Sequence, residues 1–154
     1  MKALGDLLVD SAIVLNFQAK NAEDVVNVLG ECLEEAGFVK DSFVQAALTR
    51  EKTMPTGLPL QGKFNAAIPH TDIEHVNKAG VALATLTQPV IFQNMANPEE
   101  SVSVQLVFLL ALDQPKAQIE MLQEIAGVLQ NPELIERIMS SQDSQEVLNI
   151  FREI

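Results

Sequence analysis

The side chains best suited to chemistry in this sequence are two histidines five residues apart, His70 and His75. His70 follows a short apolar stretch ending in Pro69 and precedes two polar residues, Thr71 and Asp72. The end of a strand, where the chain leaves the core, is a common place for functional groups in α/β proteins. An imidazole also suits nucleophilic attack near neutral pH, because one nitrogen can be anchored while the other attacks. His70 is therefore the candidate nucleophile; the alternative is a histidine that only caps a strand end.

His75 lies between Glu74 and Val76, and it shares its loop with Asp72. The two carboxylates could raise the pKa of its ring or orient it, whereas the alternative is a solvated loop histidine. Two histidines and two carboxylates also suggest a metal site. Their spacing matches neither a helical pair of ligands nor a usual zinc ligand set, so we expect no bound metal.

Arg50 ends a helical segment and supplies a guanidinium that can hold phosphate oxygens in a bidentate grip. A cation at the C-terminal end of a helix also complements the helix dipole, which is a sufficient structural explanation. The single cysteine, Cys32, falls on the apolar stripe of a helix and is expected to be buried and inert. The sequence lacks the motifs of α/β-hydrolases, P-loop proteins and dinucleotide-binding folds.

The segments that must position these residues alternate between strand and helix patterns. Apolar runs predict strands at residues 12–17, 65–69, 80–87, 90–93 and 102–112. Helices are predicted over residues 21–37, 41–52 and 115–129, with two shorter ones beginning at residues 131 and 143. Residues 53–64 contain glycines and prolines and are expected to form a loop. The pattern predicts one α/β domain, residues 1–154, with a mixed sheet flanked by helices on both faces.

Composition limits the partners that this chain can have. Of its 154 residues, 47% are hydrophobic and 20% are charged, which is typical of a soluble globular protein. The net charge of −11 argues against nucleic acid and anionic membranes as partners, and it favours a basic protein. The N-terminal residues do not resemble a signal peptide, and no apolar run approaches the roughly 18 residues that span a bilayer. A cytoplasmic location is therefore expected.

Two segments of the sequence carry a recognisable combination of motifs. The first runs from Leu48 to Leu58 and contains Arg-Glu and Pro-Thr-Gly; the second runs from Ala67 to Asp72 and contains Ile-Pro-His. Together they resemble the IIA domain of the fructose/mannitol superfamily of sugar phosphotransferase systems, the type-2 EIIA domain. The resemblance extends over most of the chain. It implies a phosphotransferase component that needs no cofactor.

In this family a histidine at the place of His70 carries a phosphoryl group during carbohydrate uptake. The resemblance implies that His70 receives this group from the phosphocarrier protein HPr and passes it to a cysteine of a IIB partner. The membrane subunit IIC would be met only indirectly. The resemblance also places the phosphate-site arginine at Arg50, and it assigns a phosphate-site loop with the members Pro55, Thr56, Gly57 and Thr71.

Gln118 stands where mannitol-type members carry a second histidine at the start of a late helix. Its amide cannot take a positive charge, but it can donate a hydrogen bond to a phosphate. Galactitol-type members similarly have glutamine there and a histidine at the place of His75. The resemblance therefore favours a galactitol-like subfamily, with Gln118 and His75 as further candidate site residues.

Two other functions are compatible with the same residues. A regulatory relative would use the same phosphorylated histidine to signal to another protein. A noncatalytic interaction module would keep His70 for structural reasons alone. A metal-dependent hydrolase is a more distant alternative.

Overall fold

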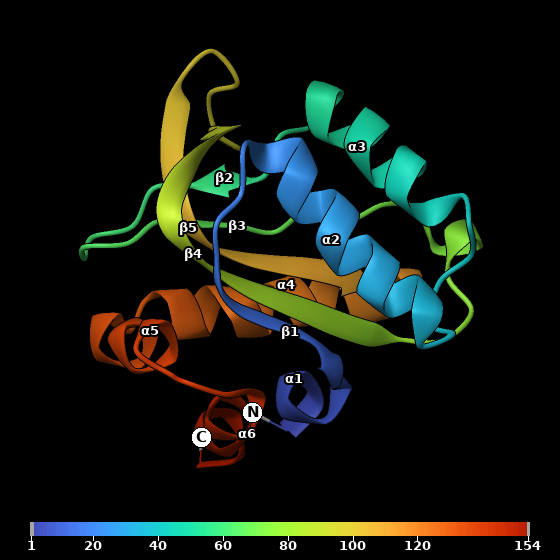
Figure 1. Cartoon of the computed structure of the whole chain (residues 1–154). Helices are drawn as coiled ribbons and strands as arrows, with labels where there is room; N and C mark the ends of the chain where they lie inside the picture. Colours follow the sequence, from blue (N-terminus) through green and yellow to red (C-terminus); the bar gives the residue numbers. More distant parts are fainter. Residues whose placement is uncertain (1, 154) are drawn as a thin grey trace.

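The computed structural model describes residues 2–153, and their side chains from Leu4 onward. Five strands form one mixed sheet in the order β1-β4-β5-β3-β2 (Figure 1). They are β1 (Leu8–Phe17), β2 (Gly57–Leu58), β3 (Ala66–Ala67), β4 (Gly80–Gln93) and β5 (Ser101–Ala111). The β1–β4 and β3–β5 pairs are parallel, whereas the β4–β5 and β2–β3 pairs are antiparallel.

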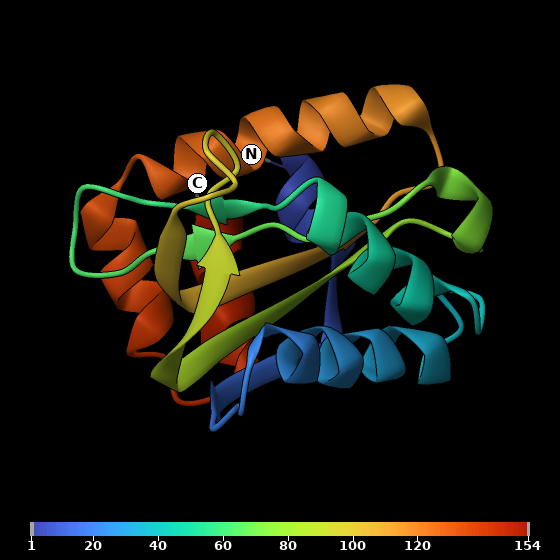
Figure 2. The ribbon, with the colours of Figure 1, turned by 90° about the horizontal axis from the view of Figure 1, so that it is seen from above.

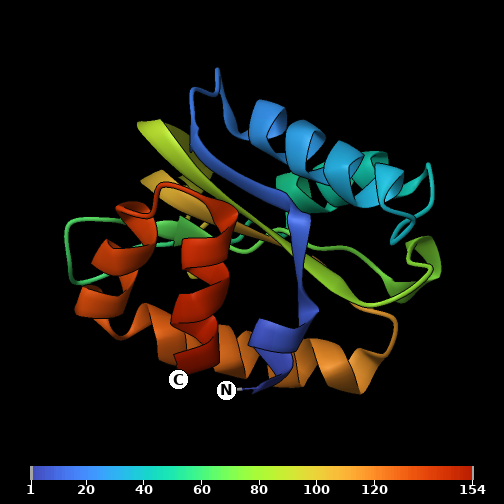
Figure 3. The same ribbon diagram turned by 60° about the horizontal axis from the view of Figure 1, so that its bottom comes forward.

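Helices cover both faces of this sheet, as the sequence predicts. They are α1 (Lys2–Leu7), α2 (Ala22–Glu35), α3 (Phe43–Thr53), α4 (Pro115–Leu129), α5 (Pro132–Met139) and α6 (Ser144–Glu153), with a 3-10 turn, η1, at Ile73–His75. α2 and α3 lie on one face, and α4 runs along the other (Figures 1 and 2). α1, α5 and α6 share the face of α4, where the first and last helices contact each other (Figure 3). The predicted fold class is confirmed.

β5 is the central strand, and it is buried on both faces. Leu106, Phe108 and Leu110 pack into the core beneath α4, α5 and α6, whereas Val107 and Leu109 pack beneath α2 and α3. A strand covered on both sides needs a continuous apolar run instead of an alternating one. This explains why the pattern at residues 102–112 predicts the strand correctly.

Short polar side chains begin three of the helices. The Asn21 side chain accepts a hydrogen bond from the Asp24 amide at 2.8 Å, and the Asn131 side chain accepts one from the Leu134 amide at 3.2 Å. The Asp143 side chain accepts from the amide of Glu146 at 2.9 Å. Each bond satisfies an amide that has no partner within its helix, so these predicted starts are confirmed.

Some predictions about the elements are wrong. The strands predicted at residues 80–87 and 90–93 form one strand, β4, with a register shift between Thr85 and Val90. The second helix begins at Phe43 instead of residue 41, and the predicted loop at residues 53–64 contains β2. α1 is not predicted at all, because it is short and carries no helix-start signal in the sequence.

The spacing of apolar residues in α4 predicts one buried stripe, and this prediction is partly wrong. The stripe consists of Ile119, Leu122, Ile125, Ala126 and Leu129. Ile119 is 61% exposed, and Ala126 is also exposed. Met121 and Val128 are buried instead, together with the correctly predicted Ile125 and Leu129. Apolar residues occupy more than one stripe of this helix, so periodicity alone does not select the face that meets the sheet.

The short strands β2 and β3 bring the two motif segments together. Gly57 of β2 pairs with Ala67 of β3, and Ala67 pairs with Val107 of β5. A Cβ atom at Gly57 would lie 2.6 Å from the carbonyl oxygen of Gln93, so only glycine fits without a backbone shift. The Pro-Thr-Gly segment is thereby fixed beside the Ile-Pro-His segment.

Candidate functional site

His70 lies just beyond β3, where an isolated bridge to Leu110 continues the pairing with β5. Its Nδ1 lies 2.9 Å from the carbonyl oxygen of Ile68. A carbonyl oxygen only accepts hydrogen bonds, so Nδ1 carries the proton and donates it. Nε2 then keeps its lone pair, and it has no hydrogen-bond partner among residues 2–153.

The surroundings of His70 keep its ring neutral. Burial lowers the pKa of His70 below its ordinary value, and the nearby Arg50 guanidinium lowers it further. The hydrogen bond to Ile68 and the Asp72 carboxylate act in the opposite direction, but burial is the largest effect. A neutral imidazole with one fixed proton and one free lone pair is the form needed for nucleophilic attack.

A hollow of about 390 Å³ opens beside His70. The end of α3, the segment that leads to β2, the β4–β5 hairpin and α4 form its walls. Its lining residues are Arg50, Thr53, Met54, Pro55, Thr56, His70, Met95, Pro98 and Leu122. The structure thus brings together His70, Arg50, Pro55 and Thr56, four of the residues that the sequence predicts for the site.

Arg50 lines this hollow and has a hydrogen-bond donor that no described residue uses. Its Nη1 lies 3.8 Å from Oδ1 of Asp72, an exposed carboxylate that binds it loosely. Its buried Nε has no hydrogen-bond partner in the described part of the chain. Buried donors are nearly always paired, so an unpaired one beside a nucleophilic ring marks a place suited to an anion. The arrangement can bind a phosphate-like group next to Nε2 of His70.

The other predicted residues lie outside the lining of this hollow. Thr71 is buried, and its carbonyl oxygen accepts a hydrogen bond from Nε2 of Gln118 at 2.9 Å. Gln118 therefore ties α4 to the segment that follows His70. Nε2 of Gln118 carries two N–H donors and Thr71 uses one of them, so contact of the other with a phosphate stays a prediction.

His75 lies on η1, away from the hollow. Its Nδ1 is 2.8 Å from Oγ of Ser42, and its Nε2 is 3.7 Å from Oε1 of Glu74. The contact with Ser42 fastens η1 to the start of α3, whereas Glu74 belongs to η1 itself. A part for His75 in phosphoryl transfer stays a prediction.

Sequence reasoning missed Glu51, whose carboxylate holds the Pro-Thr-Gly segment. Its Oε2 accepts from the amide of Thr56 and its Oε1 from the Thr56 hydroxyl, both at 2.8 Å. Burial raises the pKa of Glu51 to about 7, although the bonds from Thr56 and the charge of Arg50 lower it. The signal was available, because Glu51 directly follows Arg50 in the Arg-Glu motif. Met95 and Leu122 were also missed, since they come from segments distant in the sequence.

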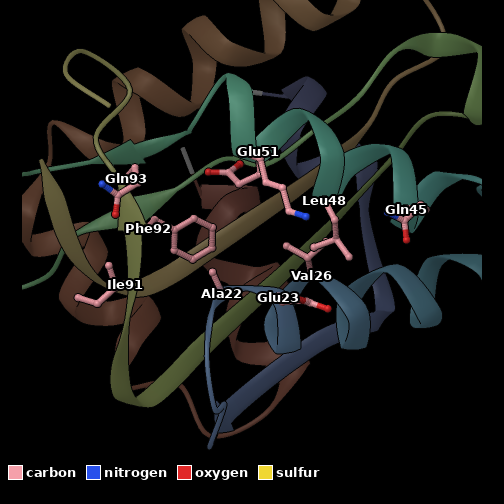
Figure 4. A pocket seen from close by; sticks show the side chains of 10 residues that line it. Ala22, Glu23, Val26, Gln45, Leu48, Glu51, Ile91, Phe92 and Gln93 are labelled. Atoms are coloured by element: carbon pink, nitrogen blue, oxygen red, sulfur yellow. The ribbon is translucent and has the colours of Figure 1, made fainter. Parts of the chain in front are cut away.

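Glu51 also contributes to the wall of a second hollow of about 280 Å³ between α2, α3 and β4 (Figure 4). Apolar side chains on this wall include Val26, Leu48 and Phe92. Figure 4 shows Glu51 extending from α3, with Glu23 on the neighbouring α2. Glu51 therefore stands between the two hollows, with its carboxylate bound to Thr56 of the His70 hollow.

The raised pKa of Glu51 predicts a pH-dependent stability. The native state holds the Glu51 proton more tightly than the unfolded chain, so this carboxyl destabilises the fold as pH rises from about 4.5 to about 7. We expect the stability advantage of Glu51→Gln over wild type to grow by about 3 kcal/mol between about pH 5 and pH 8. Urea unfolding of both proteins measures it, with Glu23→Gln as control. An equal pH dependence in Glu51→Gln and wild type would contradict the prediction.

Three further features bear on the predictions from the sequence. Within residues 2–153, no group of three or more histidine, cysteine, aspartate and glutamate side chains is arranged to hold a metal ion. In the same residues, no helix has the length and apolar character needed to cross a bilayer. Cys32 is partly buried, and burial raises the pKa of its thiol, with Glu35 and Glu31 adding to the effect.

Fold and site together define an α/β domain that presents a neutral histidine beside an anion-binding arginine. Residues 6–154 match the family described as "Phosphoenolpyruvate-dependent sugar phosphotransferase system, EIIA 2". The galactitol-specific EIIA component of Escherichia coli (strain K12) is 31% identical over 122 residues, which cover 79% of this chain and 80% of that protein.

Solved structures agree with the family match. The crystal structure of the mannitol IIA protein from Escherichia coli superimposes with a TM-score of 0.75 at 29% identity, covering 93% of this chain and 97% of that one. A second solved structure is the complex of mannitol IIA and phosphorylated IIB from the same organism. Its IIA protein has a TM-score of 0.75 at 26% identity, and the match covers 96% of this chain and 98% of that one.

The chain belongs to the EIIA type-2 family of the phosphoenolpyruvate-dependent sugar phosphotransferase system. It is thus a phosphotransferase component, as the Arg-Glu, Pro-Thr-Gly and Ile-Pro-His segments predict. Its fold is that of the mannitol IIA domains.

Proposed function

We propose that this chain is a cytoplasmic IIA subunit in which Nε2 of His70 accepts a phosphoryl group from HPr and passes it to a IIB cysteine. The observation that carries this proposal is the geometry of His70. Its Nδ1 proton is held by Ile68, and its free Nε2 belongs to a side chain that lines the same hollow as Arg50.

The transfer needs no group beyond the two proteins. The lone pair of Nε2 attacks phosphorus as the phosphorus–nitrogen bond of the donor phosphohistidine breaks, and the donor ring keeps that electron pair. Nδ1 keeps its proton and its bond to Ile68. Arg50 is placed to neutralise charge on the phosphoryl oxygens, which is the main task of a protein in phosphoryl transfer. In the second step a cysteine thiolate attacks phosphorus, and Nε2 recovers its lone pair.

The surface around His70 suits brief protein contacts. Met54 and Met95 line the hollow and are 56% and 41% exposed. Flexible methionine side chains adapt to more than one partner, as a carrier that meets both a donor and an acceptor requires. The net charge of −11 would speed the approach of a basic donor. The membrane subunit IIC would meet this chain only indirectly.

Within the family, we propose a galactitol-like polyol system. The identity to a galactitol-specific EIIA component and the presence of Gln118 and His75 support this assignment. A IIA subunit does not bind the sugar itself, so purified galactitol and mannitol IIB proteins provide the test. Faster transfer to the galactitol IIB is expected, and faster transfer to the mannitol IIB would contradict the assignment.

The central test is phosphorylation of the wild-type chain. The protein is incubated with phosphoenolpyruvate, enzyme I and HPr, and intact mass spectrometry follows one added, acid-labile phosphoryl group. Addition of IIB should then remove it. Phosphorylation without transfer to any IIB protein would favour a regulatory relative. No phosphorylation of the folded protein would overturn the proposal in favour of an interaction module.

A further inference from the structure

We infer that Glu51 is a positioning residue of the phosphoryl site, which fixes the Thr56 segment and, through it, the reactive ring of His70. This inference rests on the proposed function of His70, which it deepens. Glu51 does not line the His70 hollow, so it acts through the residues that do.

The inference begins with the two bonds to Thr56. Both carboxylate oxygens of Glu51 are used, one by the amide and one by the hydroxyl of Thr56, each at 2.8 Å. Thr56 is 2% exposed, so neither group can find water instead. Two bonds from one rigid carboxylate fix both the backbone and the side chain of Thr56, whose neighbour Pro55 also lines the hollow.

The contacts continue from Thr56 to His70. The carbonyl oxygen of Thr56 accepts a hydrogen bond from the amide of Ile68 at 3.3 Å. The carbonyl oxygen of Ile68, in turn, accepts from Nδ1 of His70 at 2.9 Å. Ile68 thus receives its position from Thr56 and determines which nitrogen of His70 carries the proton. A chain of hydrogen bonds connects Glu51 to the tautomer of the nucleophile.

A contribution to stability does not explain the presence of Glu51. Its pKa is raised to about 7, because burial destabilises the charged carboxylate more than the Thr56 bonds and the Arg50 charge stabilise it. Its charged neighbours are Arg50 and Lys52 on α3 and Glu23 on α2; the β4 residues of the shared hollow, Ile91, Phe92 and Gln93, are uncharged. A partly buried carboxylate that lowers stability and holds a site segment is typical of a functional support.

The test compares Glu51→Ala, Glu51→Gln and a matched control, Glu23→Ala. Glu51→Ala loses both bonds to Thr56, whereas a glutamine can accept from the Thr56 amide and donate to its hydroxyl oxygen. Glu23 lines the same hollow as Glu51 and is exposed, and it makes no bond to the Thr56 segment. Rates of phosphoryl acceptance from phosphorylated HPr are measured by rapid quench at varied donor concentration.

We expect Glu51→Ala to lower the rate at saturating donor by about 10-fold or more, since misplacement by ~1 Å can cost on the order of 100-fold. The donor concentration at half-saturation should change little, because the docking surface is intact. Glu51→Gln should recover most of the rate, and Glu23→Ala should match wild type. Equal rates for Glu51→Ala and Glu23→Ala would overturn the inference.

A second measurement separates positioning from a general loss of structure. Nitrogen-15 NMR of His70 reports which ring nitrogen carries the proton, and it does not depend on any partner. Wild type and Glu51→Gln should show the proton on Nδ1, whereas Glu51→Ala should show a mixture of tautomers. Should Glu51→Ala not fold, Thr56→Val removes only the hydroxyl bond and should move both readouts in the same direction.

The two proposals fail in different ways. If the wild type accepts no phosphoryl group, the proposed function fails, and the NMR measurement still tests the link from Glu51 to His70. If the wild type is phosphorylated and Glu51→Ala keeps both the wild-type rate and the wild-type tautomer, only the inference about Glu51 fails.

Discussion

Replacement of His70 by alanine is expected to abolish phosphorylation by phosphoenolpyruvate, enzyme I and HPr while leaving the fold intact. Among the described residues that line the hollow, only His70 supplies a nucleophilic nitrogen, and the Ile68 bond already fixes which nitrogen attacks. Loss of the nucleophile removes the covalent intermediate, so no residual transfer remains. Intact mass spectrometry after incubation should show the unmodified mass alone.

The matched control is His75→Ala, because it removes the other histidine of the chain. His75 bonds to Ser42 and does not line the His70 hollow, so this variant should still gain one phosphoryl group. A His70→Ala protein that is phosphorylated like wild type would refute the assignment of the carrier. Loss of phosphorylation in both variants would show that η1, which His75 fastens, also shapes the site.

The sequence predicts the residues of this site better than it predicts their support. His70 and Arg50 are recognisable by type and motif, and Pro55 and Thr56 by their position in the same segment. Some of the contacts that hold them come from backbone groups, such as the Ile68 carbonyl, which have no signature in a sequence. The two histidines show the difference: the sequence selects His70 as the nucleophile, but only the structure shows that His70 lines the hollow and that His75 bonds to Ser42.

The fold also has elements that the sequence predicts and elements that it does not. The central strand β5 is predictable because a strand buried on both faces leaves a long apolar run in the sequence. β2 is only two residues long, too short for a periodicity to be visible, whereas β3 lies within the apolar run at residues 65–69 that predicts it. These two strands bring the motif segments together. The exposed Ile119 shows that an apolar residue in a helix need not face the core. Patterns therefore identify elements, whereas the contacts between elements complete the site.

Arg50 should have the second-largest effect on transfer. Its buried Nε is unpaired in the described part of the chain, and its Nη1 has only a loose contact with the exposed Asp72. We expect Arg50→Gln to slow phosphoryl acceptance on the order of 10²- to 10³-fold, as does loss of one preorganised donor in other active sites. Arg50→Lys keeps the charge but loses the planar fork of donors, so it should recover the rate only in part.

Arg50→Gln should also raise the pKa of His70, because the positive charge of Arg50 helps to lower it. Proton NMR titration of the ring measures this change, and rapid quench measures the rate. Lys52→Gln is the matched control, since Lys52 is an exposed cation two residues further along α3 that lies outside the His70 hollow. Arg50 binds no buried carboxylate, so its loss should change the free energy of unfolding by no more than about 1 kcal/mol. A large loss of stability with unchanged transfer would mean that Arg50 serves the α3 helix end and not the phosphoryl group.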